Sequence, residues 1–115
     1  MYCTYLTIYD GKKLPHFYIG SSSITKIENG YHGSVSSIKY GDIWKQELKE
    51  NPELFKTHII STHESRQEAL DHERFLQESL NVVKSPDYIN VSLAAKNGFF
   101  GRDVSLEEII HALGL

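Results

Sequence analysis

Two stretches of sequence decide the fold: Tyr2-Cys3-Thr4-Tyr5-Leu6-Thr7-Ile8-Tyr9 and, after a short gap, His16-Phe17-Tyr18-Ile19-Gly20. Both are rich in aromatic and β-branched residues, which favour β-strands. The intervening Asp10-Gly11-Lys12-Lys13 is typical of a turn, and Pro15 is tolerated at the start of a returning strand. We therefore expect strands over residues 2–9 and 16–20 that pair as a hairpin.

The rest of the chain predicts helices and one more strand. Ser65–Glu68 and Ser105–Glu108 each match a capping box, which opens a helix. In the segment that ends at Glu50, apolar residues that include Ile38 recur at roughly helical spacing. The expected elements are a short helix over 23–29, a helix from Ser36 or Ser37 to Glu50, a strand over 55–62, a long helix from the cap at Ser65 to about Val83, a short extended piece over 88–91, a loop over 97–101 and a last helix that ends at Gly114. The expected fold class is a small α/β domain, with a three-stranded antiparallel-type sheet flanked by helices and a short C-terminal helix.

Length and composition agree with a single globular domain. The 115 residues are 40% hydrophobic and 23% charged, which excludes wholesale disorder. No apolar run approaches the roughly 20 residues of a membrane span, so we expect no membrane partner. The lone Cys3 excludes an internal disulfide framework and favours a reducing compartment, the cytoplasm.

The net charge of −3 is unevenly distributed. Residues 1–49 carry six lysines against four acidic residues, whereas residues 50–115 carry six basic against eleven acidic residues. The negative net charge argues against strong electrostatic binding of a polyanion. The first half of the chain still has enough lysines to form a basic face.

Glu73 breaks the pattern of the long predicted helix, because it lies inside the apolar stripe between Leu70 and Leu76. Burial of an isolated charge is very costly, so this carboxylate must be paired, metal-bound or protonated. It either pairs with a Lys or Arg at the edge of the stripe or binds a hard cation such as Mg²⁺. Tyr5 and Tyr18 can lie on one face of the hairpin, where they either pack or orient a water beside such a metal.

These residues together resemble a known family. Cys3-Thr4-Tyr5 followed by Tyr18-Ile19-Gly20 looks like the two half-motifs of the GIY-YIG nucleases, with phage homing endonucleases as the nearest subgroup. The helix with Glu73 resembles the family's helix that bears the metal-binding glutamate. Tyr88-Ile89-Asn90-Val91-Ser92 is similar to the segment that carries the family's catalytic-site asparagine. The resemblance implies a nuclease domain over residues 1–97, followed by a loop and short helix over 98–115.

What the resemblance implies is a divalent-metal-dependent DNA endonuclease that hydrolyses phosphodiester bonds. Glu73 would hold Mg²⁺ or Mn²⁺, and Tyr5 or His32 would activate the water. Tyr18 would orient that water or the phosphate, and Asn90 would fix the substrate or the water shell of the metal. The family places an arginine where this chain has Glu28, so Lys26 is the candidate to offset the transition-state charge.

Other interpretations stay open. The acidic balance and the missing arginine also fit a weakly active or inactive GIY-YIG-fold module that binds nucleic acid or protein, and an unrelated α/β adaptor is a further alternative. The C-terminal helix has one apolar face, which docks either on its own domain or on a second chain, as in a homodimer or a complex with a partner protein. DNA is the expected main partner, encountered in the cytoplasm, that of a bacterial host if the protein is phage-encoded.

Overall fold

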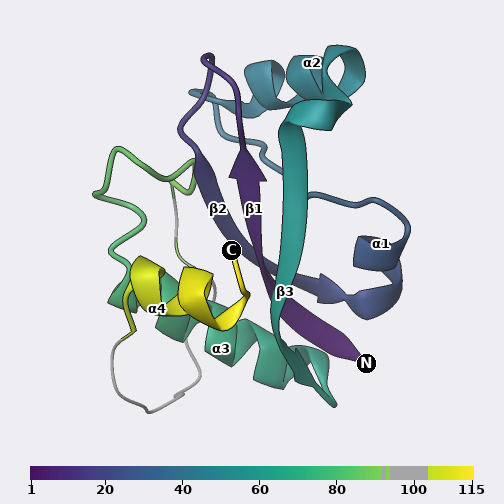
Figure 1. Ribbon diagram of the computed structural model, residues 1–115, viewed down its shortest axis with the longest axis vertical. Coiled ribbons are helices and arrows are strands. Elements are labelled where there is room, and N and C mark those ends of the chain that lie inside the picture. The colour runs from purple at the N-terminus through teal and green to yellow at the C-terminus, as the bar shows by residue number, and fades with distance from the viewer. Residues whose placement is uncertain (92, 94–103) are drawn as a thin grey trace.

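The computed structural model describes residues 1–91, 93 and 104–115. It is built on one three-stranded antiparallel sheet, in which β1 (Tyr2–Tyr9) lies between β2 (Phe17–Ser23) and β3 (Phe55–His63) (Figure 1). The small α/β fold and the antiparallel sheet expected from the sequence are therefore confirmed. No helix in the described part of the chain is long and apolar enough to cross a bilayer.

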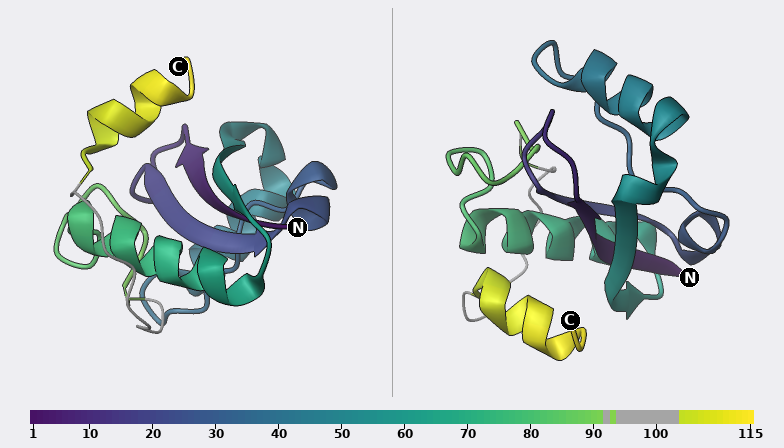
Figure 2. Two further views of the ribbon diagram at one scale, coloured as in Figure 1. Left: turned by 90° about the horizontal axis from the view of Figure 1, so that it is seen from below. Right: turned by 45° about the horizontal axis from the view of Figure 1, so that its top comes forward.

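Helices cover the sheet on both sides. The long helix α3 (Arg66–Ser79) runs across one face and contacts β1 and β2 (Figure 2). The short helix α1 (Ile24–Glu28) follows β2 directly, and α2 (Gly41–Glu50) leads through a 3-10 turn (Pro52–Leu54) into β3. The last helix, α4 (Leu106–Ala112), packs on the same core as α3.

Two hydrophobic clusters form on opposite faces of the sheet, because successive side chains of β1 point in opposite directions. Leu6 belongs to the cluster beneath α3, and Tyr9 belongs to the cluster beneath α2. The first cluster contains Leu6, Ile19, Leu76, Val82, Tyr88 and Ile109, and the second contains Tyr9, Leu14, Val35, Trp44, Phe55 and Ile89. The central strand is consequently buried on both sides, with six of its eight residues inside.

The two predicted capping boxes are confirmed at their serines. The hydroxyl of Ser65 accepts a hydrogen bond from the amide of Glu68, and that of Ser105 accepts one from Glu108. Ser23 caps α1 in the same way. These interactions are local, so the sequence pattern is enough to predict them.

Two helix boundaries differ from the expectation. Helix α2 begins at Gly41 rather than at Ser36 or Ser37, because the preceding residues form a turn, and Ile38 is fully exposed instead of lying on an apolar face. Helix α3 ends at Ser79 rather than near Val83. Asn81 adopts a positive φ of 55°, a conformation that asparagine tolerates and that ends the helix, which leaves Val83 exposed.

The C-terminal helix docks on its own domain. Ile109 is buried in the cluster beneath α3, and Val104, Leu106 and Leu113 pack against that cluster. Of the two open alternatives for its apolar face, the structure therefore shows the intramolecular one. The expected loop over 97–101 and the domain boundary after residue 97 lie outside the described residues.

Candidate active site

Glu73 is held at the edge strand β2 by two neutral hydrogen-bond donors. The hydroxyl of Ser21 donates to Oε1 of Glu73 at 2.5 Å, and the amide of Gln77 donates to Oε2 at 2.9 Å. No lysine or arginine of the described residues forms an ion pair with Glu73. The structure therefore shows neither the expected Lys nor the expected Arg partner.

Burial raises the pKa of the Glu73 carboxyl above its ordinary value, and the hydrogen bonds from Ser21 and Gln77 oppose that shift. Desolvation is the larger effect, so the carboxylate lies in a site that disfavours its own negative charge. A cation beside it would reverse this imbalance, which is the behaviour expected of a metal ligand.

A second half of the site comes from β1 and β2. Tyr5 is buried and lies opposite Gly20 in the strand register, while Tyr18 is half-buried and donates a hydrogen bond from its hydroxyl to the carbonyl of Ser34. The rings of Tyr5 and Tyr18 have centroids 6.2 Å apart. The expectation that these two tyrosines share one face of the hairpin is confirmed.

The carboxylate of Glu73 contributes to a raised pKa at both tyrosines. Burial raises the pKa of Tyr5 far above its ordinary value, and electrostatic repulsion of a Tyr5 phenolate by Tyr18, Tyr31 and Glu73 raises it further. Burial also raises the pKa of Tyr18, with Glu73 as the next cause. The hydroxyls therefore keep their protons at neutral pH.

Asn90 lies at the same strand edge, but its amide is engaged. Its Oδ1 accepts from the backbone amide of Ile19 at 3.0 Å, and its Nδ2 donates to the carbonyl of Ile19 at 2.9 Å. The side chain thus pairs with β2 as a neighbouring strand would. Asn90 is buried and fixes the segment after Tyr88 to β2. It therefore holds the backbone around the site in place.

Two depressions meet at Glu73. The first is lined by Tyr18, Glu73, Gln77 and Asn90 together with the loop over 34–37. The second is a groove between α1 and the start of α3, and its walls include Ser21, Lys26, Tyr31 and Glu73. Among the described residues that line either depression, Glu73 is the sole carboxylate. Glu73 therefore has access to both.

Tyr31 lies where the sequence led us to expect His32. Its ring centroid is 6.4 Å from that of Tyr5, its hydroxyl bonds Ser34 Oγ at 2.7 Å, and Lys26 Nζ lies 5.6 Å from its ring centroid. Tyr31 lines the groove beside Glu73. The only hint of this in the sequence is that an aromatic residue, Tyr31, directly precedes His32 in a loop, where spacing does not fix which side chain faces the site.

His32 points elsewhere. Its Nδ1 bonds Thr57 Oγ1 on β3 at 2.7 Å, and its ring packs near Phe55, with centroids 5.8 Å apart. Accordingly, His32 is not among the described residues that line either depression at Glu73. The loop turns at Gly30 and Gly33, which have φ values of 92° and 115°, and this turn separates the two neighbouring side chains.

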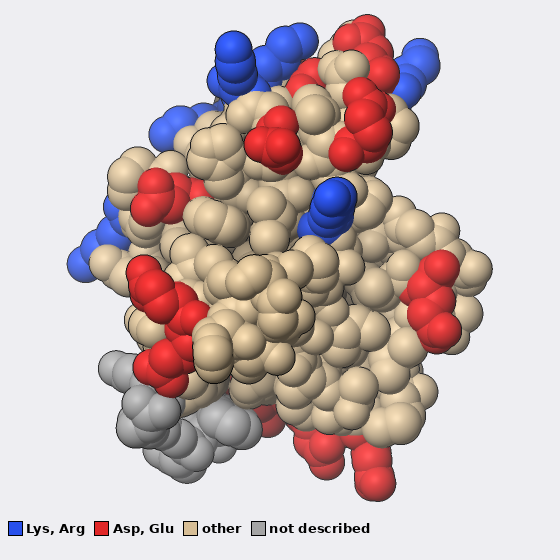
Figure 3. Space-filling model, viewed as in Figure 1, with Lys and Arg blue, Asp and Glu red and all other residues tan. Residues whose placement is uncertain are grey.

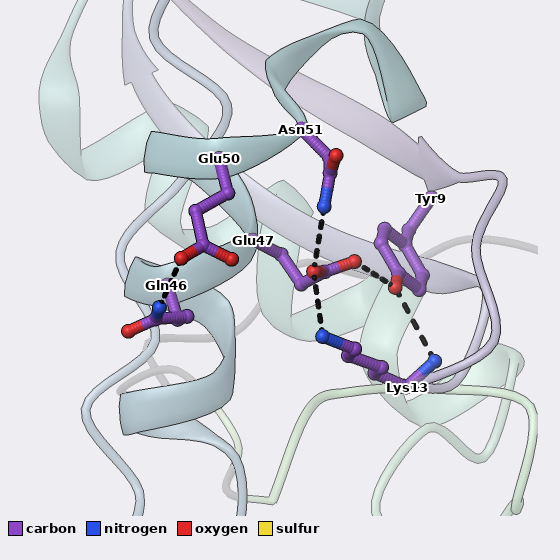
Figure 4. Close-up of polar contacts among 6 residues, drawn as sticks. All are labelled: Tyr9, Lys13, Gln46, Glu47, Glu50 and Asn51. Atoms are coloured by element: carbon purple, nitrogen blue, oxygen red, sulfur yellow. Dashed lines mark hydrogen bonds and ion pairs between the residues drawn. The ribbon is translucent and has the colours of Figure 1, made fainter.

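A second buried carboxylate provides a contrast. Glu47 of α2 is 2% exposed, and it accepts hydrogen bonds from Tyr9 at 2.5 Å and Asn51 at 3.0 Å, with Lys13 Nζ at 3.5 Å (Figure 4). The hydrogen bond from Tyr9 is the main cause that lowers the pKa of Glu47. Glu47 is thus a fully paired carboxylate that ties the hairpin to α2, whereas Glu73 has no cationic partner in the described part of the chain.

The donor set fits a magnesium-type ion bound mainly through water and substrate. Mg²⁺ is typically held by one or two carboxylates, with water and phosphate oxygens as the other ligands. Glu73 supplies one carboxylate, and the described residues contain no group of three or more His, Cys, Asp or Glu side chains that could hold a metal by themselves. The site could therefore bind such an ion together with a phosphate.

Charged side chains are spread unevenly over the surface. On the face shown in Figure 3, basic and acidic side chains are interspersed over the hairpin tip and α2, and acidic side chains also lie near α4. Lysine and arginine do not form one broad basic patch on this face. The net charge of −3 is unfavourable for binding a polyanion, so a bound phosphate would depend on individually placed cations rather than on the overall charge.

Comparison of the chain with protein-family models, with curated proteins and with solved structures gives no match.

Proposed function

We propose that the chain is a divalent-metal-dependent DNA endonuclease of the GIY-YIG type, similar to phage homing endonucleases and active in the cytoplasm. The observation that carries the proposal is the half-buried Glu73 carboxylate, which has no cationic partner among the described residues and opens into two polar depressions. Tyr5 and Tyr18 lie on one side of it and Lys26 on the other. This is the arrangement that hydrolysis of a phosphodiester requires: a metal ligand, hydroxyl groups for the water and a cation for the phosphate.

Each residue has a separate role in the proposed reaction. Glu73 holds Mg²⁺ or Mn²⁺, which when bound polarises the phosphate and stabilises the leaving oxygen. Tyr18 orients the attacking water or the phosphate. Tyr5 would first lose its own proton to solvent beside the bound metal ion, and its phenolate would then take the proton of the attacking water and return to the phenol. Lys26, which is exposed at the rim of the groove, offsets the negative charge that develops on the phosphate.

Two features of the structure modify the roles expected from the sequence. Tyr31 takes the place of His32 beside Tyr5, so it is the aromatic hydroxyl that faces the groove. Asn90 acts as a positioning residue, since both ends of its amide bind the backbone of Ile19. One such site cuts one strand in each event, so we expect nicked products from a monomer.

A plasmid-nicking assay tests this proposal. Wild type should convert supercoiled plasmid to the nicked form in Mg²⁺ or Mn²⁺ and not in EDTA. Glu73→Gln should abolish cleavage and leave the fold intact, as checked by circular dichroism. The matched control is Glu78→Gln, which removes a carboxylate from an exposed position of the same helix and should cleave like wild type.

The alternative function is a binding module without catalysis. The raised pKa of Tyr5 and the acidic Glu28 in place of the family's arginine favour it. Pure wild type that binds DNA but cuts none with any divalent ion would select the module. Full activity of well-folded Glu73→Gln would instead refute the role of Glu73 and leave a nuclease with a different metal ligand.

A further inference from the structure

Arg66 shares the groove with Glu73, although no motif of the sequence singled it out. It is the first residue of α3 and lies seven residues before Glu73, which places both side chains on one face of the helix. Ala69 and Leu70 lie between them and line the floor of the groove. Ala69 is buried and small, so the groove stays open from the carboxylate to the guanidinium.

The opposite wall carries hydrogen-bond donors and a second cation. It is formed where β2 runs into α1, and it presents the hydroxyls of Ser22 and Ser23 and the ammonium of Lys26. In Figures 1 and 2, α1 and the start of α3 lie at the same end of the sheet. Arg66 and Lys26 thus approach one groove from separate elements.

Neither cation is neutralised within the described residues. Arg66 and Lys26 form no ion pair there, and the only acidic residue among the described residues that line the groove is Glu73 at its far end. In a chain with a net charge of −3, this polar groove therefore carries two positive charges that have no ion-pair partner among residues 1–91, 93 and 104–115. An extended anion with its own hydrogen-bond acceptors matches this lining, and a nucleic-acid backbone is such an anion.

We propose that Arg66 binds a phosphate of the DNA backbone that neighbours the phosphate attacked at Glu73. The inference rests on the proposed function, because it assumes that the scissile phosphate lies at Glu73. The groove then guides the strand along α3 from Glu73 to Arg66. Lys26 lies on the opposite wall, and Arg66 offers the planar fork that binds phosphate oxygens in pairs.

The separation of Arg66 from Glu73 determines which kinetic step it affects. Seven residues of α-helix span about 10 Å along the axis, so a single phosphate bound at Glu73 does not also occupy the end of the groove at Arg66. A contact to a neighbouring phosphate is equally strong in the ground state and the transition state, and it lowers KM without a change in kcat. Arg66 should therefore act on binding, whereas Glu73 and Lys26 act on the chemical step.

The test uses Arg66→Ala and Arg66→Lys, with Arg74→Ala as the matched control on the same helix but outside the groove. Binding of a short fluorescein-labelled DNA duplex is measured by anisotropy in EDTA, over a series of salt concentrations. Arg66→Ala should weaken binding about tenfold and reduce the slope of log K against log salt by about 1. Arg66→Lys should keep the slope and regain part of the affinity, and Arg74→Ala should match wild type.

Cleavage kinetics separate this inference from the proposed function. Arg66→Ala should raise KM about tenfold and leave kcat unchanged. An Arg66→Ala protein with wild-type affinity and salt slope would overturn the inference, whatever the cleavage result. A lower kcat with unchanged KM would also overturn it, because Arg66 would then act on the scissile phosphate. If wild type cuts no DNA, the proposed nuclease activity fails, and the binding measurements alone decide whether Arg66 holds a backbone phosphate.

Discussion

The ring of Tyr5 lies directly across Gly20, its register partner on the neighbouring strand. A Cβ atom placed on Gly20 would lie 2.5 Å from Cζ of Tyr5. The same ring passes close to Gly33, where a Cβ would lie 2.8 Å from the Tyr5 hydroxyl and 2.7 Å from Cε2 of Tyr18. Tyr5 can therefore be buried in the middle of the site only because two of its neighbours have no side chain.

Gly20→Ala should destabilise the protein by about 1–3 kcal/mol, since the added methyl group forces the ring of Tyr5 out of its place. Denaturant unfolding measures this cost. A double-mutant cycle with Tyr5→Ala is the control, and it should remove most of the cost because the clash is then absent. An equal cost in both backgrounds would show that the strand, and not Tyr5, requires glycine at this position.

Lys26→Ala should slow cleavage by about 10²-fold, because removal of one electrostatic stabiliser of a transition state typically has an effect of that order. Lys26→Arg should keep part or all of the rate, since the positive charge is retained. Single-turnover rates in Mg²⁺ measure both variants. Unchanged cleavage by Lys26→Ala would move the role to another cation, with Lys39 as the next variant to make.

The buried pair of Tyr9 and Glu47 should make stability depend on pH. The hydrogen bond from Tyr9 lowers the pKa of Glu47 in the folded protein below its value in the unfolded chain. The pair therefore contributes stability above a pH of about 4.5, and this contribution is lost as the pH falls through the lowered pKa. Wild type should exceed Tyr9→Phe in melting temperature near neutrality, and the difference should shrink in acid. A difference that stays constant with pH would assign the effect to packing of the ring.

His72 should make a second contribution to the loss of stability in acid. Burial, and then the charge of His63, lower the pKa of His72 to about 4. Its Nδ1 bonds the hydroxyls of Thr4 and Ser61, both at 2.9 Å. The unfolded chain takes up the proton first, near its ordinary pKa of about 6.5, so stability falls as the pH drops from there towards 4.

The measurement for His72 is the melting temperature of His72→Gln against pH, with His111→Gln at an exposed position as the control. His72→Gln should flatten the decline between about pH 6.5 and 4. His111→Gln should leave it unchanged. A wild-type decline that persists in His72→Gln would assign the acid sensitivity to another group.

Ile109→Ala should destabilise the protein by about 2–5 kcal/mol, because Ile109 is buried in the cluster beneath α3 and its truncation leaves a cavity. Leu115→Ala, at a residue that is 56% exposed, should change stability by less than about 0.5 kcal/mol. Chemical denaturation measures both variants. Cleavage of non-specific DNA by folded Ile109→Ala should stay at the wild-type level, and a loss of DNA affinity without a loss of stability would contradict the docked role of α4.

Several parts of this molecule could be predicted from the sequence because their causes are local. The aromatic and β-branched run over residues 2–9 forms the central strand, and Ser65 and Ser105 cap the helices that follow them. Glu73 could be recognised as unusual from its place in an apolar stripe alone. Each of these patterns depends on neighbours within about four residues along the chain.

The rest was decided by tertiary structure. Two glycines with positive φ set the turn of the loop after α1, so Tyr31 and not His32 faces Tyr5. Asn90 binds the backbone of Ile19, a residue 71 positions away in the chain. Arg66 and Lys26 line one groove only because β2 and α3 bring α1 and the start of α3 together. Side-chain direction in loops, and the partners that a polar group finds across the fold, depend on contacts between distant segments, and no local pattern encodes these contacts.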